Sequence, residues 1–221
     1  MELYDVMRTT FAAREFLDEP VADKTLRRIL DNARFAPSGG NRQGWRVIVV
    51  REAATRKAML PMIMPTFQRY SAQVQAGEDP WNTIVETKLS DAEIAGSPAP
   101  DGFIRQVLGA PVLLVVLLDL AVVASFDRHL DRVGVVSGAS VYPFVWNILL
   151  AARNEGYGGT LTTFISARED ELKTLLGIPA QFALAALIPI GKPTRQLTRL
   201  TRKPVDEIAV REKWDGESLR D

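Results

Sequence analysis

Ala36-Pro37-Ser38-Gly39-Gly40-Asn41-Arg42-Gln43-Gly44-Trp45 is the stretch on which the interpretation of this chain depends. It connects an amphipathic pattern to a β-branched run. Glycine allows a backbone to approach a flat ligand closely, and the side-chain amides of Asn41 and Gln43 offer donors and an acceptor to the mixed edge of a heterocycle. The stretch indicates either a ligand-binding loop or an ordinary helix-to-strand connection whose amides bond the backbone.

Two helices are predicted before this stretch. The first covers residues 3–10. Pro20 interrupts the local structure, and Asp23 is a candidate cap for the second helix. One face of that second helix collects its apolar side chains, which are Leu26, Ile29, Leu30 and Ala33.

Three apolar runs predict the strands of a buried sheet. Residues 46–50 are rich in β-branched side chains, residues 111–119 are apolar at nearly every position, and residues 182–190 form a third run. Strands that are apolar throughout are typically buried on both faces. Helices are predicted over residues 52–60 and 172–178. Because strands mix with helices throughout, the fold class is α+β or α/β in a layered sandwich.

Residues 133–152 are almost entirely apolar but are interrupted by serines, a proline and an asparagine. A run of this length is compatible with a membrane span, yet the polar interruptions and the average hydropathy of the chain favour a buried central helix. Gly156 marks its end as a C-terminal cap. A helix that is apolar all round needs partners on every side, which predicts contact with a second copy of the chain and hence a homodimer.

Residues 61–100 show no clear period and contain several prolines. A long, poorly patterned segment within a compact protein is typical of a lid or an insertion. Its aromatic side chains Phe67, Tyr70 and Trp81 are candidates to line a substrate pocket, unless the segment is a covering subdomain with a small core of its own. Residues 194–221 are polar and follow the last strand, so we expect an arm that covers a neighbour.

Composition narrows the function classes. The chain has 221 residues, of which 27 are basic and 27 acidic, so it lacks the basic surplus with which proteins neutralise nucleic-acid phosphates. It has no cysteine, which excludes disulfides, iron–sulfur clusters and thiolate catalysis. A single histidine, His129, argues against a histidine metal centre and is expected at the surface. We expect one domain over residues 1–221, cytoplasmic because no signal-peptide pattern opens the chain, with no membrane and no nucleic-acid partner.

Four segments, in this order, resemble the nitroreductase family of flavoproteins. They are Arg14-Glu15-Phe16 with Pro20-Val21; the 36–45 stretch; Leu-Leu-Ala-Ala-Arg-Asn-Glu-Gly-Tyr-Gly-Gly at 149–159; and Ile-Pro-Ile-Gly-Lys-Pro at 188–193 followed by Arg202-Lys203-Pro204-Val205. Each segment alone is a weak signal. Together, in the family's order and at plausible spacing from end to end, they are a strong one.

The resemblance implies an α+β fold, a layered sandwich whose mixed or antiparallel central sheet is flanked by helices, in an intertwined homodimer. It implies FMN at the subunit interface and NADPH or NADH as the electron donor. Hydride would pass from NAD(P)H to flavin N5, and after the product leaves, a small acceptor such as a nitroaromatic or a quinone would take the electrons at the same face. The flavin carries this chemistry, so we assign no catalytic side chain and no metal.

The same resemblance implies which residues hold the cofactor. Arg14 would lie near the N1–O2 edge of the flavin and Arg202 at its phosphate, roles that suit the donor fork of a guanidinium. Asn41 and Gln43 would contact the ring and its surroundings. Three residues are expected from the opposite subunit: Pro37, Ser38 and Gly39. Three more are expected against the ring, with their backbone toward N5 or O4: Gly158, Gly159 and Thr160.

The chain departs from the family pattern at the phosphate. The family usually has one or two further basic residues just before the position of Arg14, whereas Thr10 and Phe11 stand there in this chain. Arg8, one turn earlier, and the hydroxyl of Thr10 are candidate substitutes. Gly44 also replaces the proline that commonly precedes the tryptophan, which predicts a looser loop.

Two alternatives stay open. One is another reaction on the same flavin scaffold, such as reductive dehalogenation, flavin destruction or a dehydrogenation. The other is a non-enzymatic protein that binds flavin. The chain has no G-x-G-x-x-G after a strand, so no Rossmann site for NAD(P)H is expected, and it has no G-x-S-x-G elbow, which argues against a hydrolase.

Overall fold

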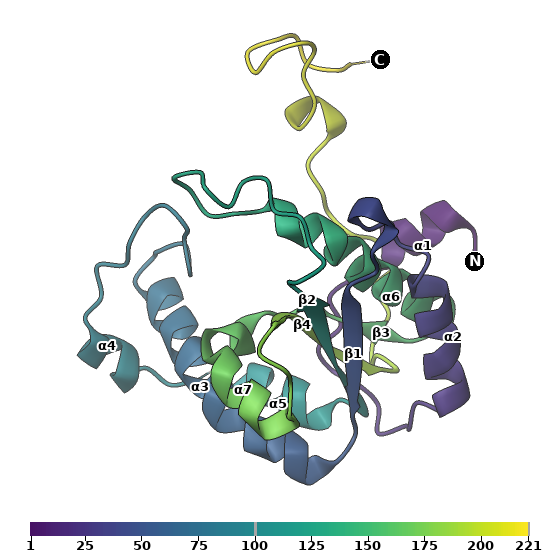
Figure 1. Cartoon of the computed structure of the whole chain (residues 1–221), viewed down its shortest axis with the longest axis vertical. Coiled ribbons are helices and arrows are strands. Elements are labelled where there is room, and N and C mark those ends of the chain that lie inside the picture. The colour runs from purple at the N-terminus through teal and green to yellow at the C-terminus, as the bar shows by residue number, and fades with distance from the viewer. Residues whose placement is uncertain (100, 221) are drawn as a thin grey trace.

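A four-stranded antiparallel sheet forms the centre of the computed structural model, which describes residues 1–99 and 101–220 (Figure 1). The last residues of the predicted lid and arm, Pro100 and Asp221, lie outside the described residues. The strands are β1 (Trp45–Val50), β2 (Val112–Asp119), β3 (Gly158–Gly159) and β4 (Phe182–Gly191), and their spatial order is β1-β2-β4-β3. The three predicted strands are confirmed. Strand β3 was not predicted, because it lies in no apolar run.

Helices cover both faces of the sheet, so the predicted layered α+β sandwich is confirmed (Figure 1). One face carries α2 (Asp23–Ala33) and α6 (Tyr142–Asn154), with α1 (Leu3–Thr9) packed against α6. The other face carries α3 (Ala53–Gln75), α5 (Asp101–Gly109) and α7 (Glu169–Leu176). A short helix, α4 (Asp91–Gly96), packs on α3 at the edge of the molecule.

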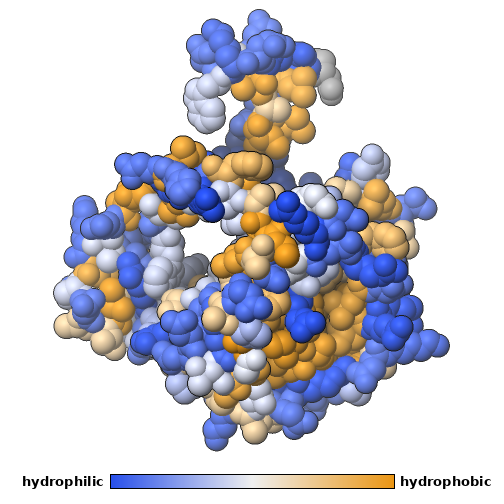
Figure 2. Space-filling view, viewed as in Figure 1, coloured by the Kyte–Doolittle hydropathy of each residue, from blue (hydrophilic) through white to orange (hydrophobic). Residues whose placement is uncertain are grey.

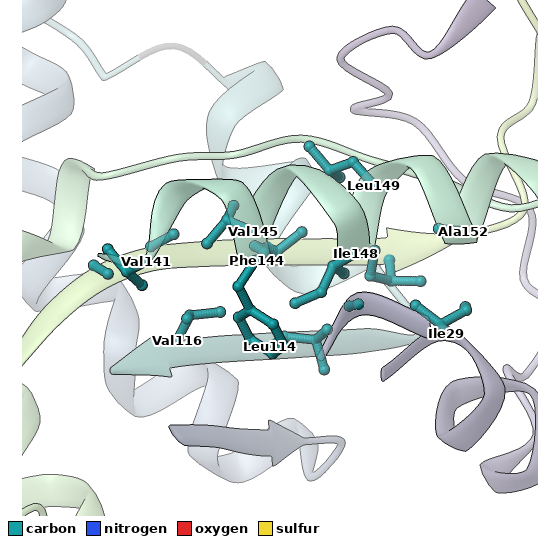
Figure 3. Close-up of a cluster of buried hydrophobic side chains, with 14 of the residues drawn as sticks. Ile29, Leu114, Val116, Val141, Phe144, Val145, Ile148, Leu149 and Ala152 are labelled. Carbon is teal, nitrogen blue, oxygen red and sulfur yellow. The ribbon is translucent and has the colours of Figure 1, made fainter. Parts of the chain in front are cut away.

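The central strand β2 connects the two halves of the core. On one side, Leu114 and Val116 pack with Phe144 and Ile148 of α6 (Figure 3). On the opposite side, its alternate residues join Met59 and other side chains of α3, α5 and α7. Every residue from Val112 to Leu118 is buried, as an apolar run without alternation predicts.

Helix α3 corrects the predicted helix over residues 52–60, which ends too early. It continues to Gln75 through Pro61 and Pro65, although proline removes a helical hydrogen bond. Its buried residues Met59, Ile63 and Phe67 lie along one side and pack into the core. Tertiary packing of this face therefore outweighs the local effect of the prolines.

The predicted helix over 133–152 is also corrected, because α6 begins only at Tyr142. A 3₁₀ turn, Val136–Ser140, precedes it, and residues 133–135 are exposed loop. The C-terminal end agrees with the prediction. Gly156 has φ +83°, its N–H donates to the Arg153 carbonyl (3.1 Å), and the next N–H donates to the Ala152 carbonyl (2.8 Å). This is the Schellman arrangement that favours glycine.

Two further details of the helix termini differ from the prediction. Asp23 does not cap α2: Ala22 holds the cap position, and the Asp23 carboxylate pairs with Arg51 at 2.7 Å. The short helix predicted over 172–178 is α7, which begins earlier at Glu169 and ends at Leu176. Three acidic residues lie in its first turn, where their negative charge interacts favourably with the helix dipole and stabilises the helix.

The C-terminal arm, residues 194–220, rises away from the body of the molecule (Figure 1). Its regular structure is a 3₁₀ turn (Val205–Glu207) and a bridge between Val210 and Ser218. Trp214 in this hairpin is 97% exposed, and Figure 2 shows apolar residues on the arm. The single chain therefore leaves apolar side chains of the arm uncovered.

Candidate functional site

The glycine-rich loop after α2 is held in an unusual backbone conformation. Gly40, Asn41 and Gln43 have φ values of +60°, +54° and +49°, in the left-handed region that favours glycine and tolerates asparagine. The Ser38 Oγ accepts from the Gln43 N–H at 2.9 Å, and the Gln43 Nε2 donates to the Asn41 Oδ1 at 3.1 Å. Within one chain, the two amide side chains thus bond inside the loop, and all four residues from Gly40 to Gln43 are exposed.

The loop is anchored at both ends to distant segments. The Gly39 N–H donates to the Ser140 Oγ at 3.2 Å, a contact that local sequence gave no reason to expect. Gly44 does not loosen the loop as predicted: its carbonyl accepts from the Asp119 N–H at 2.8 Å. A Cβ at Gly44 would lie 2.7 Å from the Cγ2 of Val122, so close packing fixes this position. The residue before Trp45 is therefore held by the end of β2.

The second glycine segment is β3, at the edge of the sheet beside the N-terminal motif. The Ala13 N–H donates to the Gly159 carbonyl at 3.0 Å. A Cβ at Gly158 would lie 2.9 Å from that of Ala13, and one at Gly159 would lie 2.6 Å from the Pro189 carbonyl oxygen. Packing within the chain thus requires both glycines, and Thr160 beside them is 3% exposed. The arrangement places Arg14 one residue from the β3 contact.

Arg14 itself is exposed and carries little internal bonding. Its Nη1 donates to the Ala12 carbonyl at 3.3 Å, and no ion pair involves it in the part of the chain that the structure describes. Arg14 lines a cavity of about 510 Å³ together with Phe16, Arg105 and Thr194. Glu15 lines the same hollow, so two guanidinium groups, a carboxylate and an aromatic ring share it.

The residues proposed for the phosphate have different surroundings. The buried Thr10 hydroxyl donates to the Val6 carbonyl at 2.7 Å, so its hydrogen is already used inside the N-terminal segment. The exposed Arg8 guanidinium lies 5.9 Å from the centre of the Tyr4 ring. Arg202 is exposed on the arm, where its Nη1 donates to its neighbour's carbonyl at 2.7 Å.

The structure connects some of the predicted site residues and not others. Arg14 lies beside β3, and the Gln196 Nε2 donates to the Thr9 carbonyl at 3.0 Å, which fixes the base of the arm at the end of α1. No hydrogen bond joins the 36–45 loop to Arg14 or to β3 among residues 1–99 and 101–220. The loop bonds instead to residues 119, 122 and 140.

A second cavity, of about 490 Å³, lies between α3, the chain after it, and the 3₁₀ turn Phe164–Arg168. Tyr70 and Trp81 line it, as predicted for a substrate pocket. Phe67 does not: it is 2% exposed and packs edge-on against Phe164, with ring centres 4.8 Å apart. The 61–100 segment thus combines both predicted roles, a pocket wall and part of a small core. Figure 2 shows an opening between the side of the molecule that carries α4 and the body.

Asp127 and His129 line neither of these two cavities. Asp127 is 3% exposed and its Oδ2 accepts from the Val135 and Val136 N–H groups (2.7 and 3.2 Å) and from Arg132 (2.9 Å). These bonds hold the Asp127 pKa far below its usual range, and the bond from the Val135 N–H has the largest effect. They also fix the loop before α6 to the Asp127 side chain. His129 is exposed, as predicted, and its Nε2 accepts from Arg128 at 2.9 Å. In the described residues, no group of three metal-ligating side chains comes together.

Comparisons with known proteins agree with the fold. The model of the nitroreductase family matches residues 7–192. A nitrobenzene nitroreductase from Ectopseudomonas oleovorans is 28% identical over 211 residues, covering 85% of each chain. An NADH dehydrogenase from Thermus thermophilus is 25% identical and covers 89% of each. Human iodotyrosine deiodinase 1 is 24% identical over 95% of this chain and 68% of its own.

Two solved structures are similar over almost their whole length. An oxidised iodotyrosine deiodinase bound to FMN and 3-iodo-L-tyrosine has a TM-score of 0.66 at 22% identity, with 92% of this chain and 96% of that chain covered. A BluB-like flavoprotein from Clostridium difficile has a TM-score of 0.70 at 22% identity, with 96% and 100% covered. Among the described residues, no helix has both the length and the apolar character to cross a membrane.

Proposed function

The chain belongs to the nitroreductase family, and on that premise we propose that it is an FMN-dependent oxidoreductase that uses NADPH or NADH to reduce a nitroaromatic, a quinone or a similar small acceptor. The two substrates take turns at one site in a ping-pong sequence. The working unit is a homodimer, in which Pro37, Ser38 and Gly39 serve the site of the opposite subunit.

The observation that supports this proposal most is the environment of Arg14. Its guanidinium is exposed, makes no ion pair in the described part of the chain, and lines a cavity with Glu15 and Arg105. The N–H of the preceding residue, Ala13, donates to the Gly159 carbonyl of β3. The cavity volume of about 510 Å³ is in the range of cofactor and substrate sites. The donors present suit FMN, which needs cations for its phosphate and hydrogen-bond donors at the N1–O2 edge.

The roles of the protein follow from these donors. Bound FMN supplies the acceptor and the donor of hydride. Arg14 would hold the polar edge of the ring and stabilise negative charge there, which is how a protein tunes a flavin. Arg202 would pair with the phosphate. The exposed amides of Asn41 and Gln43 would exchange their internal bonds for contacts to the ring, and Gly158, Gly159 and Thr160 would lie along it.

The basic residues that the family usually has before the position of Arg14 are replaced in this proposal by the base of the arm, in addition to Arg202. Thr10 and Phe11 supply no cation, and the Thr10 hydroxyl hydrogen is bonded to Val6. The Gln196 amide fixes the segment that carries Arg195 and Arg199 against the carbonyl of Thr9. Both arginines are exposed and make no ion pair within residues 1–99 and 101–220, so their charge is available to a phosphate.

An absorption spectrum of the purified protein, before and after addition of NADPH or NADH without oxygen, tests this function. Visible flavin bands that bleach with either nucleotide support it. Flavin bands that neither nucleotide bleaches would contradict it and favour a non-enzymatic flavin-binding protein. A colourless protein that takes up no added FMN would contradict both.

Reductive dehalogenation is a second candidate, because the match to human iodotyrosine deiodinase 1 covers 95% of this chain. The two reactions differ in what oxidises the reduced protein. After anaerobic reduction, return of the oxidised spectrum on adding nitrobenzene but not 3-iodotyrosine supports the nitroreductase-type reaction. Return only with 3-iodotyrosine, with release of iodide, supports dehalogenation.

A further inference from the structure

The left-handed backbone of the 36–45 loop needs support from outside the loop. Two of its residues that are not glycine, Asn41 and Gln43, have positive φ values of +54° and +49°. A backbone of this kind persists only where the surrounding structure holds it, and it is common at binding sites. Residues 40–43 are exposed, so burial of the loop does not hold them in place. The contacts between the loop and the rest of the chain therefore decide its conformation.

One segment, residues 119–140, supplies these contacts, and we call it the strap. At the start of the strap, the Asp119 N–H donates to the Gly44 carbonyl at 2.8 Å. Three residues later, the Val122 carbonyl accepts from the Arg42 Nη1 at 3.3 Å. The strap thus follows the C-terminal half of the loop before it leaves it.

The far end of the strap returns to the loop through Ser140. This side chain is buried, and its Oγ accepts from the Gly39 N–H at 3.2 Å. A Cβ at Gly39 would lie 3.4 Å from the same oxygen, so the strap and the loop are in contact there. In the proposed homodimer, Gly39 and the two residues before it serve the flavin of the opposite subunit. Ser140 therefore fixes the part of the loop that is assigned to the cofactor.

The carboxylate of Asp127 holds the middle of the strap to the turn that carries Ser140. Asp127 is 3% exposed, and its Oδ1 accepts from the Ser125 hydroxyl at 3.1 Å. Its Oδ2 accepts from the N–H groups of Val135 and Val136, and Val136 is the first residue of the 3₁₀ turn that ends at Ser140. A buried carboxylate that loses its charge leaves its donors without a full partner, which is costly. Asp127 is thus the group on which the geometry of this turn depends.

We propose that Asp127 and Ser140 are positioning residues for FMN. Asp127 holds the turn that carries Ser140, and Ser140 fixes Gly39, so that the 36–45 loop keeps the conformation that binds the cofactor. Neither side chain touches the cofactor, and both lie outside the four segments that resemble the family. This inference rests on the proposed function, because that function assigns the loop to FMN.

Amide hydrogen exchange of the full-length apoprotein, followed by NMR, tests the path from Asp127 to the loop. Asp127→Asn keeps the size of the side chain but removes its charge and one acceptor oxygen. We expect the Gly39 N–H to exchange about tenfold faster. The Ala13 N–H, which bonds to the Gly159 carbonyl at the other glycine segment, should keep its rate within about twofold. Equal acceleration of both amides would indicate general destabilisation and overturn the proposal.

Asp131→Asn is the matched control for this measurement. Asp131 is exposed, belongs to the same strap and makes no ion pair within residues 1–99 and 101–220. Its variant should leave the Gly39 exchange rate unchanged. The same acceleration in D131N as in D127N would also overturn the proposal.

Titration of flavin fluorescence with each apoprotein tests the consequence for FMN. Ser140→Ala removes one hydroxyl group, so it tests the path even where Asp127→Asn does not fold. We expect the Kd for FMN to rise about three- to tenfold in S140A and about tenfold in D127N. Because Asp127 acts through Ser140, adding D127N to S140A should raise the Kd by less than about threefold more. An unchanged Kd in both single variants, or effects that multiply in full, would overturn the proposal.

Failure of the strap and failure of the proposed function give different results. Bleaching of the wild-type flavin by NADPH or NADH reports on the function and involves neither variant. Bleaching in a protein whose Gly39 exchange and FMN affinity ignore Asp127 and Ser140 would retain the oxidoreductase and remove the positioning role. Affinity for FMN that depends on both residues, in a protein whose flavin does not bleach, would retain the positioning role and remove the oxidoreductase.

Discussion

At the scale of single residues, Arg14 is one of the arginines that make no ion pair in the part of the chain that the structure describes. It is exposed, its internal bond is a 3.3 Å contact to a backbone carbonyl, and it lines a cavity with a second arginine. An exposed arginine that makes no ion pair is well placed for an anionic ligand.

Replacing Arg14 with alanine should weaken FMN binding about ten- to a hundredfold, because a hydrogen-bonded charge contributes about 1.5–3 kcal/mol. The Kd for FMN, from a titration of flavin fluorescence with apoprotein, measures this. Arg46→Ala is the control, since Arg46 is also exposed but lies on β1, away from the cavity lining. An R14A protein with the affinity of the wild type would contradict the role assigned to this residue.

Glu78 predicts a pH dependence. The Thr87 hydroxyl and then the Lys88 N–H stabilise its carboxylate and lower its pKa below the ordinary value. Because the folded-state pKa is lowered, the carboxylate stabilises the fold above the unfolded-state pKa, and the contribution is lost as the pH falls through the folded-state pKa. Glu78→Gln should therefore lower the Tm at neutral pH, and its difference from wild type should shrink below about pH 4.

Thermal unfolding followed by circular dichroism, at neutral pH and below about pH 4, measures the Tm of E78Q and of the wild type. Glu86→Gln is the control, as Glu86 is exposed in the same segment. A difference between E78Q and the wild type that is the same at both pH values would show that the carboxylate is not the stabilising group.

At the scale of elements, β3 shows why a motif can serve packing and binding together. The resemblance assigns its glycines to the flavin ring, and the structure shows that the chain itself needs them: a Cβ at Gly159 would meet the Pro189 carbonyl at 2.6 Å and the Ile190 side chain at 2.7 Å. The sequence marked the position as glycine-dependent. It gave no signal that packing against β4 and α6 imposes that dependence.

Gly159→Ala should therefore lower the free energy of unfolding by about 1–3 kcal/mol, the usual cost of overpacking a tight site. Chemical denaturation of the apoprotein measures this without any contribution from cofactor. Gly102→Ala is the matched control, because a Cβ there has open space within helix α5 and should be neutral or slightly stabilising. Equal stability of G159A and G102A would refute the packing argument.

Elements that depend on continuous local signals were predicted well, and those that depend on distant contacts were not. The strands around Val47, Val115 and Ile188 follow from uninterrupted apolar runs. Helix α3 was cut short at Pro61 because its packing against the sheet is not visible locally. The same holds for the site: Asn41 and Gln43 identify a loop, but its anchor Ser140 lies 101 residues from Gly39 in the sequence.

At the scale of the whole molecule, the arm is the part that the single chain leaves incomplete. Ile208 and Trp214 are 68% and 97% exposed on a segment that projects from the body (Figure 1). An exposed apolar surface of this kind is typical of an interface, and aromatic side chains such as tryptophan often dominate its affinity. The predicted homodimer gives this surface a partner.

Trp214→Ala should weaken the homodimer at least about tenfold, because truncating a buried interface tryptophan typically costs more than 1 kcal/mol. Analytical ultracentrifugation over a concentration series measures the dimer dissociation constant. Lys213→Ala, at the neighbouring exposed position, should leave it nearly unchanged. A wild-type protein that sediments as a monomer at micromolar concentration would contradict the dimer itself.

The position of β2 between β1 and β4 has a consequence for how the protein is made. On the ribosome, β1 and β2 are synthesised well before β4 (Phe182–Gly191), so the nascent chain carries the apolar run of Val112–Leu118 with one edge paired and the other bare. Pairing across such a sequence separation is slow, and open strand edges aggregate. During translation there is therefore a stage at which β2 has not yet paired with β4. We expect the nascent chain to need chaperones most at that stage.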